Sequence, residues 1–108
     1  MKWYRNLYVS NSIGDKANRI KWKINHNAGT ISVYVIAFAS NSQNLLDIIP
    51  AWELMQKSYP KKQMKIIGLA NGYEDALELV RTIIDETYQH TGDVDVWKYL
   101  KEERRRMA

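Results

Sequence analysis

The chain has 108 residues, of which 45% are apolar and 26% are charged, as expected for one folded domain and not for a disordered chain. It contains no cysteine, which excludes disulfides, iron–sulfur clusters and thiolate zinc sites and favours a reducing compartment. The net charge of +4 divides unevenly, with +7 in residues 1–70, −5 in residues 71–100 and +2 in residues 101–108.

The N-terminal third of the chain predicts two strands separated by a helix. Residues 3–9 alternate between two sets of side chains, as half-buried strands do. Ser12 can cap a helix over residues 13–26, where apolar side chains recur at spacings of four and three residues. The side chains of this narrow stripe are Ile13, Ala17, Ile20 and Ile24. Residues 30–39 are apolar on both faces and predict a strand in the interior of a sheet.

The middle of the chain predicts a helical segment in two parts, followed by a third strand. Asn44 suits the cap of a helix over residues 45–49. Pro50 suits the first position of a second helix that ends near Ser58. Residues 63–70 then predict a strand.

The C-terminal third predicts two helices. Residues 73–90 show the clearest helical periodicity, and a terminal helix from about residue 96 is expected to fray in the charged tail 101–108. The predicted core face of the helix over residues 73–90 consists of Tyr73, Ala76, Leu77, Val80, Ile84, Thr87 and Tyr88. Leu79 and Ile83 widen this face. Across the chain, the side chains that we expect to be nearly fully buried are Ile20, Ile24, Val33, Val35, Ala37, Ile67, Leu77, Val80 and Ile84.

The order of these elements, β-α-β-α-β-α-α, predicts an α/β fold with a three-stranded, mostly parallel sheet in a single domain over residues 1–100. The alternative is a ferredoxin-like α+β sandwich without its last strand, in which the second and third strands run antiparallel. Because the connection over residues 40–62 is too long for a tight hairpin, we favour the first.

The sequence contains few residues suited to catalysis or metal binding. Its two histidines, His26 and His90, both lie at predicted helix ends and show no metal-binding spacing. The acidic residues of the helix over 73–90, Asp85 and Glu86 among them, are expected to form a solvated face. We therefore predict no catalytic residue, no metal site and no cofactor, and the chain is more typical of a binding protein than of an enzyme.

Small polar residues follow each predicted strand. If the three strands were parallel, these residues would meet at one edge of the sheet, where α/β folds bind ligands, and helix N-termini there attract phosphate. Ordinary caps and turns need the same residue types. The candidate ligand edge consists of Ser10, Asn11, Ser40, Asn41, Asn71 and Gly72.

One tryptophan of the first helix lies opposite its apolar stripe. Exposed aromatic side chains beside arginine are common in protein interfaces, so we predict an interface made of Arg19, Trp22, Lys23 and His26. Another element packing over Trp22 is the alternative. The same helix also suggests a nucleic-acid contact through Lys16, Arg19 and Lys23, extended by the arginine tail Arg104–Arg106.

Two segments, Leu45–Pro50 and Gly68–Val80, resemble small uncharacterised bacterial proteins of about this length. The resemblance implies a bacterial cytosolic protein, and neither segment is a catalytic signature. No apolar run approaches the about 20 residues of a membrane span, and the first residues are polar or aromatic. We therefore expect a cytoplasmic protein without membrane contact.

These features together predict a small non-enzymatic module that acts through protein contacts, as a homo-oligomer or with another protein. One alternative is a nucleic-acid-binding module that uses the basic first helix and the arginine tail. The other is a binder of phosphate or of a small ligand at the strand ends.

Overall fold

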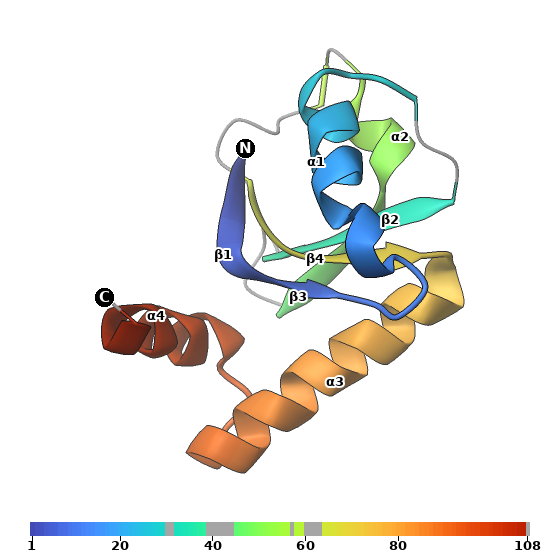
Figure 1. The fold of residues 1–108 in the computed structure, drawn as a ribbon. Coiled ribbons are helices and arrows are strands. Elements are labelled where there is room, and N and C mark those ends of the chain that lie inside the picture. The colour runs from blue at the N-terminus through green and yellow to red at the C-terminus, as the bar shows by residue number, and fades with distance from the viewer. Residues whose placement is uncertain (30–31, 39–44, 57, 60–63, 108) are drawn as a thin grey trace.

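A mixed four-stranded sheet forms the centre of the computed structural model, which describes residues 1–29, 32–38, 45–56, 58–59 and 64–107 (Figure 1). The strands lie in the order β1-β4-β2-β3. Strand β1 pairs parallel with β4, and β2 pairs antiparallel with both β4 and β3. The strand bounds are Lys2–Val9 for β1, Val33–Phe38 for β2, Leu46–Pro50 for β3 and Lys65–Asn71 for β4.

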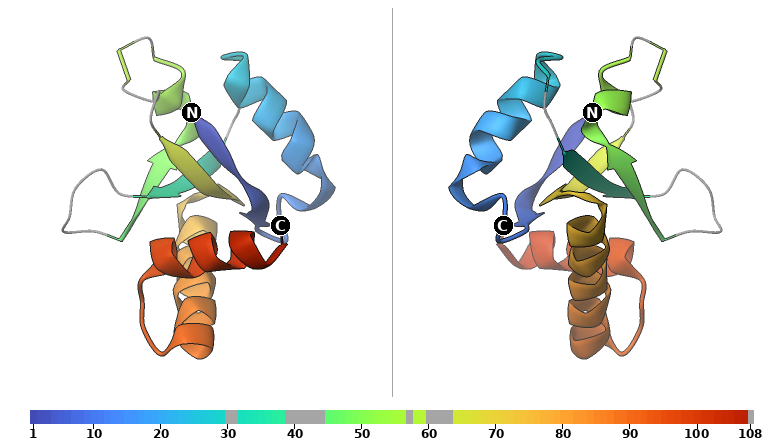
Figure 2. Two further views of the ribbon diagram at one scale, coloured as in Figure 1. Left: turned by 90° about the vertical axis from the view of Figure 1, so that its left-hand side faces the viewer. Right: turned by 90° about the vertical axis from the view of Figure 1, so that its right-hand side faces the viewer.

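Helices cover both faces of this sheet. Helices α1 and α2 lie on one face, and α3 and α4 lie on the other (Figures 1 and 2). A short 3₁₀ turn (Gly14–Lys16) leads into α1. The helix bounds are Ala17–Asn25 for α1, Ala51–Leu54 for α2, Tyr73–Thr91 for α3 and Val96–Met107 for α4. The protein is thus a single mixed α/β domain. Within the described ranges, no helix combines the length and the apolar character that crossing a membrane requires.

The alternation of side chains along the strands creates two cores, one on each face of the sheet. Val35 and Ile36 are neighbours in β2, yet they lie in different cores because successive strand residues point to opposite faces. The core beneath α1 and α2 contains Ile13, Ile20, Ile24, Val33, Val35, Ala37, Ile49, Ala51, Leu54, Ile66 and Leu69. The core beneath α3 and α4 contains Ile36, Ile67, Ala70, Ala76, Leu79, Ile83, Val96, Tyr99 and Leu100.

The prediction of a three-stranded, mostly parallel sheet is wrong in strand number and in direction. Residues 45–49, predicted as helix, lead into and form most of strand β3. Ile48 and Ile49 are β-branched, and Pro50 disfavours helical geometry at the residue before it. Pro50 itself pairs with Tyr34 at the edge of the sheet, a position that proline tolerates. Helix α2 begins after Pro50, as predicted, but ends at Leu54.

The ferredoxin-like alternative anticipated one feature of the sheet. The strands predicted over residues 30–39 and 63–70 are β2 and β4, which do pair antiparallel. The alternative nevertheless differs from the structure, because that class places its helices on one face of the sheet. Here α1 and α3 belong to different cores. The position of β2 between β4 and β3 confirms the prediction of an interior strand.

Helix α3 packs through one side of the predicted core face, the side that Leu79 and Ile83 were expected to widen. Its buried side chains are Ala76, Leu79, Ile83 and Thr87. Leu77, which we expected in the core, is 45% exposed, and Val80 and Ile84 are half-buried. The other six side chains of the predicted core, on α1, β2 and β4, are buried as expected. Helix α4 continues to Met107, and fraying of the tail 101–108 in solution stays a prediction.

Candidate functional site

Helix α1 presents an exposed aromatic and basic surface, the Trp22 face, made of Arg19, Trp22, Lys23 and His26. Trp22 is 57% exposed and belongs to neither core. Its ring stacks on that of His26, with 4.2 Å between the centroids and 21° between the planes. The Nδ1 atom of His26 also lies 2.8 Å from the carbonyl oxygen of Trp22. The expectation that Trp22 lies outside the core is confirmed, and its contact with a partner stays a prediction.

A cavity of about 390 Å³, the α1 cavity, opens beside the Trp22 face. Three of its lining residues are the cations Lys16, Arg19 and Lys23, and none of them is acidic. Its other walls come from the loop before α1 and from the strand ends. The full lining is Ser12, Ile13, Lys16, Arg19, Ile20, Lys23, Gly29, Val33 and Asn71. The structure thus brings two residues of the predicted interface and one of the predicted ligand edge to a single cavity.

Only part of the predicted ligand edge is assembled. Because β1 and β4 are parallel, with Val9 opposite Leu69, Ser10–Asn11 and Asn71–Gly72 leave the sheet at the same edge. Strand β2 runs the other way, so its last residue, Phe38, lies opposite Leu46 and away from that edge. Ser40 and Asn41 lie outside the described residues.

Two backbone N–H groups at this edge already have partners. The backbone N–H of Asn71 donates to Oδ2 of Asp75 at 2.8 Å, and the N–H of Gly72 donates to the carbonyl of Ser32. Ser10 is buried, and its hydroxyl has no hydrogen-bond partner in the described part of the chain. Asn71 is the one predicted edge residue that lines the α1 cavity.

The remaining candidate residues lie apart. The structure does not describe the side chains of Arg104–Arg106. Of the residues predicted to contact nucleic acid, it describes the side chains of Lys16, Arg19 and Lys23. His90 lies on α3, on the other side of the sheet from His26, and its Nδ1 atom is 2.9 Å from the carbonyl oxygen of Glu86. Among the described residues, no three histidine or acidic side chains gather in a way that could hold a metal ion.

The structure also forms a second basic cavity that the sequence did not predict. This cavity, the α4 groove, lies between the first residues of β1 and β4 and helix α4, and combines lysines with aromatic side chains. The sequence holds only a weak signal, the position of Lys2 next to the first predicted strand. The groove exists only because β1 pairs with β4 and α4 packs beside them.

Comparisons with known proteins add no relative: no family model matches the chain, and neither the curated proteins nor the solved structures contain a significant match. The resemblance of two segments to small bacterial proteins stays a prediction.

Proposed function

We propose that the protein is a non-enzymatic module that acts through protein contacts, and that the Trp22 face of one copy docks on helix α3 of a second copy. The observation that carries the proposal is the exposure of Trp22, whose ring is held in place by His26 and contributes to no core of its own chain. Exposed tryptophan and arginine side chains are the residue types that most often anchor protein interfaces.

Helix α3 offers an apolar surface that fits such an anchor. About 90° around the helix from its buried side chains lies a second apolar row, the α3 stripe. It consists of Tyr73, Leu77, Val80, Ile84 and Tyr88. Tyr73, Leu77 and Tyr88 are each between 45% and 55% exposed. Contiguous exposed apolar surface of this kind marks contact sites in soluble proteins.

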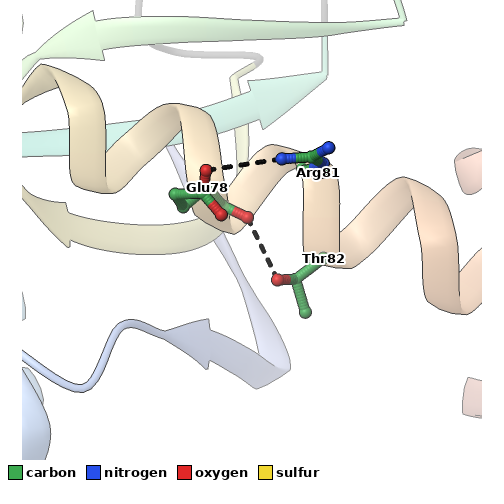
Figure 3. A network of polar contacts seen from close by, with 3 residues as sticks. All are labelled: Glu78, Arg81 and Thr82. Carbon is green, nitrogen blue, oxygen red and sulfur yellow. Dashed lines mark hydrogen bonds and ion pairs between the residues drawn. The ribbon is translucent and has the colours of Figure 1, made fainter.

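The charges beside the two surfaces are complementary. The Trp22 face carries Arg19 and Lys23, whereas Glu74, Glu78 and Asp85 border the α3 stripe. Figure 3 shows Arg81, the only arginine of α3, paired with Glu78 at 3.6 Å, while the hydroxyl of Thr82 donates to the carbonyl of Glu78. The positive charge of Arg81 is thereby offset, so α3 presents a net negative surface to a basic partner.

The position of the two surfaces determines the geometry of the assembly. Helices α1 and α3 lie on opposite faces of the sheet (Figure 1), so they cannot both take part in one two-fold interface. A contact between α1 of one copy and α3 of the next is therefore head-to-tail, which produces a ring or an open chain of copies.

Sedimentation velocity at several protein concentrations tests this proposal with two variants. Arg19→Glu with Trp22→Ala disables the Trp22 face, and Leu77→Arg with Glu78→Lys disables the α3 stripe. All four side chains are exposed, so both variants should fold. We expect the wild type to associate and each variant alone to stay monomeric. An equimolar mixture should form 1:1 dimers, because each variant retains one intact surface.

Other outcomes would contradict the proposal. A wild type that stays monomeric at every concentration excludes self-association. If the α3 variant still dimerises while the Trp22 variant does not, the Trp22 face pairs with its own copy and the α3 contact is wrong. Loss of a central anchor weakens binding by at least about 2 kcal/mol, or roughly 30-fold.

The α1 cavity supports a second candidate function, the binding of phosphate. This function is supported by three cations, Lys16, Arg19 and Lys23, which line one cavity that has no acidic lining residue. Calorimetric titration with inorganic phosphate and with single-stranded DNA distinguishes a phosphate site from a nucleic-acid contact. For a single strand, the logarithm of the binding constant falls with the logarithm of the salt concentration, with a slope of about 0.7 per phosphate contacted.

A further inference from the structure

The α4 groove is a cavity of about 320 Å³ on the side of the molecule where β1 begins. Strands β1 and β4 form one wall, helix α4 forms another, and Phe38 at the end of β2 closes it. The lining residues are Lys2, Trp3, Tyr4, Phe38, Lys65, Ile67, Trp97, Leu100 and Lys101. Its volume lies at the lower end of the about 300–1,000 Å³ typical of small-molecule sites.

Three lysines give the groove its charge. Lys2 and Lys65 lie directly opposite each other in the parallel pair of β1 and β4, and Lys101 reaches the groove from α4. No lining residue is acidic, and no carboxylate of a described residue forms an ion pair with any of the three. Two like charges opposite each other on neighbouring strands are destabilising. A bound anion would relieve this repulsion.

The aromatic side chains give the groove a flat apolar surface. Trp97 is 44% exposed. The ring of Phe38 packs edge-on against it with 5.0 Å between the centroids, and the Nζ atom of Lys65 lies 4.0 Å from the centroid of the indole. Ile67 and Leu100 are buried. A ligand that fits this groove therefore combines a negative charge with a flat apolar ring.

Helix α4, which contributes Trp97, is anchored to the rest of the fold. Its side chains Val96, Tyr99 and Leu100 are buried in the core with α3, and the hydroxyl of Tyr99 donates to Oε2 of Glu86 at 3.1 Å. The wall of the groove is thus held in place before a ligand arrives, which lowers the entropic cost of binding.

We propose that the α4 groove binds a nucleoside phosphate, with the base against Trp97 and the phosphate between Lys2, Lys65 and Lys101. Bases stack on aromatic side chains in a manner that tolerates any sequence, and lysines bind phosphate as point charges. The same chemistry is present in a free nucleotide and in one unit of a single-stranded nucleic acid. This site is separate from the Trp22 face and does not depend on the proposed self-association.

An NMR titration of the four indole N–H groups locates the ligand directly, because the tryptophans lie in different parts of the chain. The probes are adenosine monophosphate, adenosine and inorganic phosphate. We expect the monophosphate to shift the signal of Trp97 most and to leave those of Trp22 and Trp52 unchanged. We expect adenosine and inorganic phosphate each to bind at least about tenfold more weakly, because each lacks half of the ligand.

Matched variants separate the groove from general basicity. Lys65→Met removes the lysine over Trp97 and should weaken binding of the monophosphate about tenfold. The control is Lys21→Met, which removes a similar lysine 5.5 Å from the ring of Trp3, but one that does not line the groove. Circular dichroism of both variants reports whether the fold is intact. Equal effects of the two substitutions would contradict the proposal.

Titration with short single-stranded oligonucleotides distinguishes a site for a free nucleotide from a site for one unit of a nucleic acid. If affinity rises with length and falls steeply with salt, the groove holds one unit of a longer strand, and if length adds nothing, it holds a free nucleotide. The proposal is wrong if the monophosphate shifts no indole signal at millimolar concentration. It is also wrong if inorganic phosphate binds as tightly as the monophosphate, since the aromatic wall then recognises nothing.

Discussion

Glu86 acts as a junction between three elements, although its position on an acidic helix suggested a solvated side chain. The hydroxyls of Tyr8 from β1 and Tyr99 from α4 both donate to its Oε2 atom. Tyr8 also stacks on Tyr4, with 6.4 Å between the ring centroids. A single half-buried carboxylate thus links the edge strand, α3 and the terminal helix, and helps to position the wall of the α4 groove.

The stability of the protein should depend on Tyr8 at alkaline pH. Burial and the hydrogen bond to Glu86 raise the pKa of Tyr8 far above its usual value, so the folded state retains a proton that the unfolded chain releases near pH 10. The contribution of Tyr8 is therefore complete below about pH 10 and is lost as the pH rises beyond it. Urea unfolding of the wild type and of Tyr8→Phe at pH 7 and pH 11 measures this loss.

We expect Tyr8→Phe to cost about 1 kcal/mol at pH 7, because one hydrogen bond to a carboxylate is removed while Tyr99 remains. The difference between the two proteins should shrink or reverse at pH 11. A difference that is the same at both pH values would show that Tyr8 does not hold its proton through the native fold.

Helix α3 carries two apolar rows, and only the packing decides which of them is buried. The periodicity places the centre of its core face near Leu77, Val80 and Ile84. In the structure, the side chains expected only to widen that face, Leu79 and Ile83, are buried instead. Leu79 packs over the sheet close to Gly68, where an added Cβ would lie 3.2 Å from its side chain. The other row is left half-exposed and becomes the proposed docking surface.

Alanine substitutions along α3 test this register. Ile83→Ala should lower the free energy of unfolding by about 2–5 kcal/mol, because it leaves a cavity in the core. Val80→Ala should cost about 1 kcal/mol, because the side chain is half-buried. Leu77→Ala, at an exposed position, should cost about 0.5 kcal/mol or less in the monomer. Urea unfolding at low protein concentration gives all three values. A larger cost at Leu77 than at Ile83 would reverse the assignment.

In the folded molecule, the uneven charge along the chain becomes a separation of charge between the two faces of the sheet. The basic helix α1 lies on one face of the sheet and the acidic helix α3 on the other (Figure 1). Within the described residues, the only ion pair seen joins Glu78 and Arg81 inside α3. The two faces therefore do not neutralise each other within one molecule, which leaves both available to a partner.

Self-association should consequently weaken as salt is added. Raising the ionic strength from 0.1 M to 1 M shortens the screening length from about 10 Å to about 3 Å. We expect the association constant to fall about fivefold, equivalent to about 1 kcal/mol, because surface charge pairs contribute energies of this size. Association should persist, since burial of Trp22 does not depend on salt. Sedimentation at the two ionic strengths gives the ratio of the two association constants. Stronger association in 1 M salt would exclude the proposed charge pairing.

Local periodicity in the sequence specifies several elements of the fold. These are the strands near residues 3–9, 30–39 and 63–70, helices α1, α3 and α4, and the exposure of Trp22. Each of them depends on residues within a few turns or pleats of one another, so their pattern is visible in the sequence.

The other features arise only in the folded chain, because they depend on pairs of residues that are far apart in the sequence. The segment at Ile48–Ile49 is short and apolar, and it becomes a strand because β2 offers it hydrogen-bonding partners. Lys2 meets Lys65, and Tyr8 meets Glu86, only after β1 has paired with β4 and α3 has packed on the sheet. The two cavities have the same origin, since each is lined by side chains from elements that no local pattern brings together.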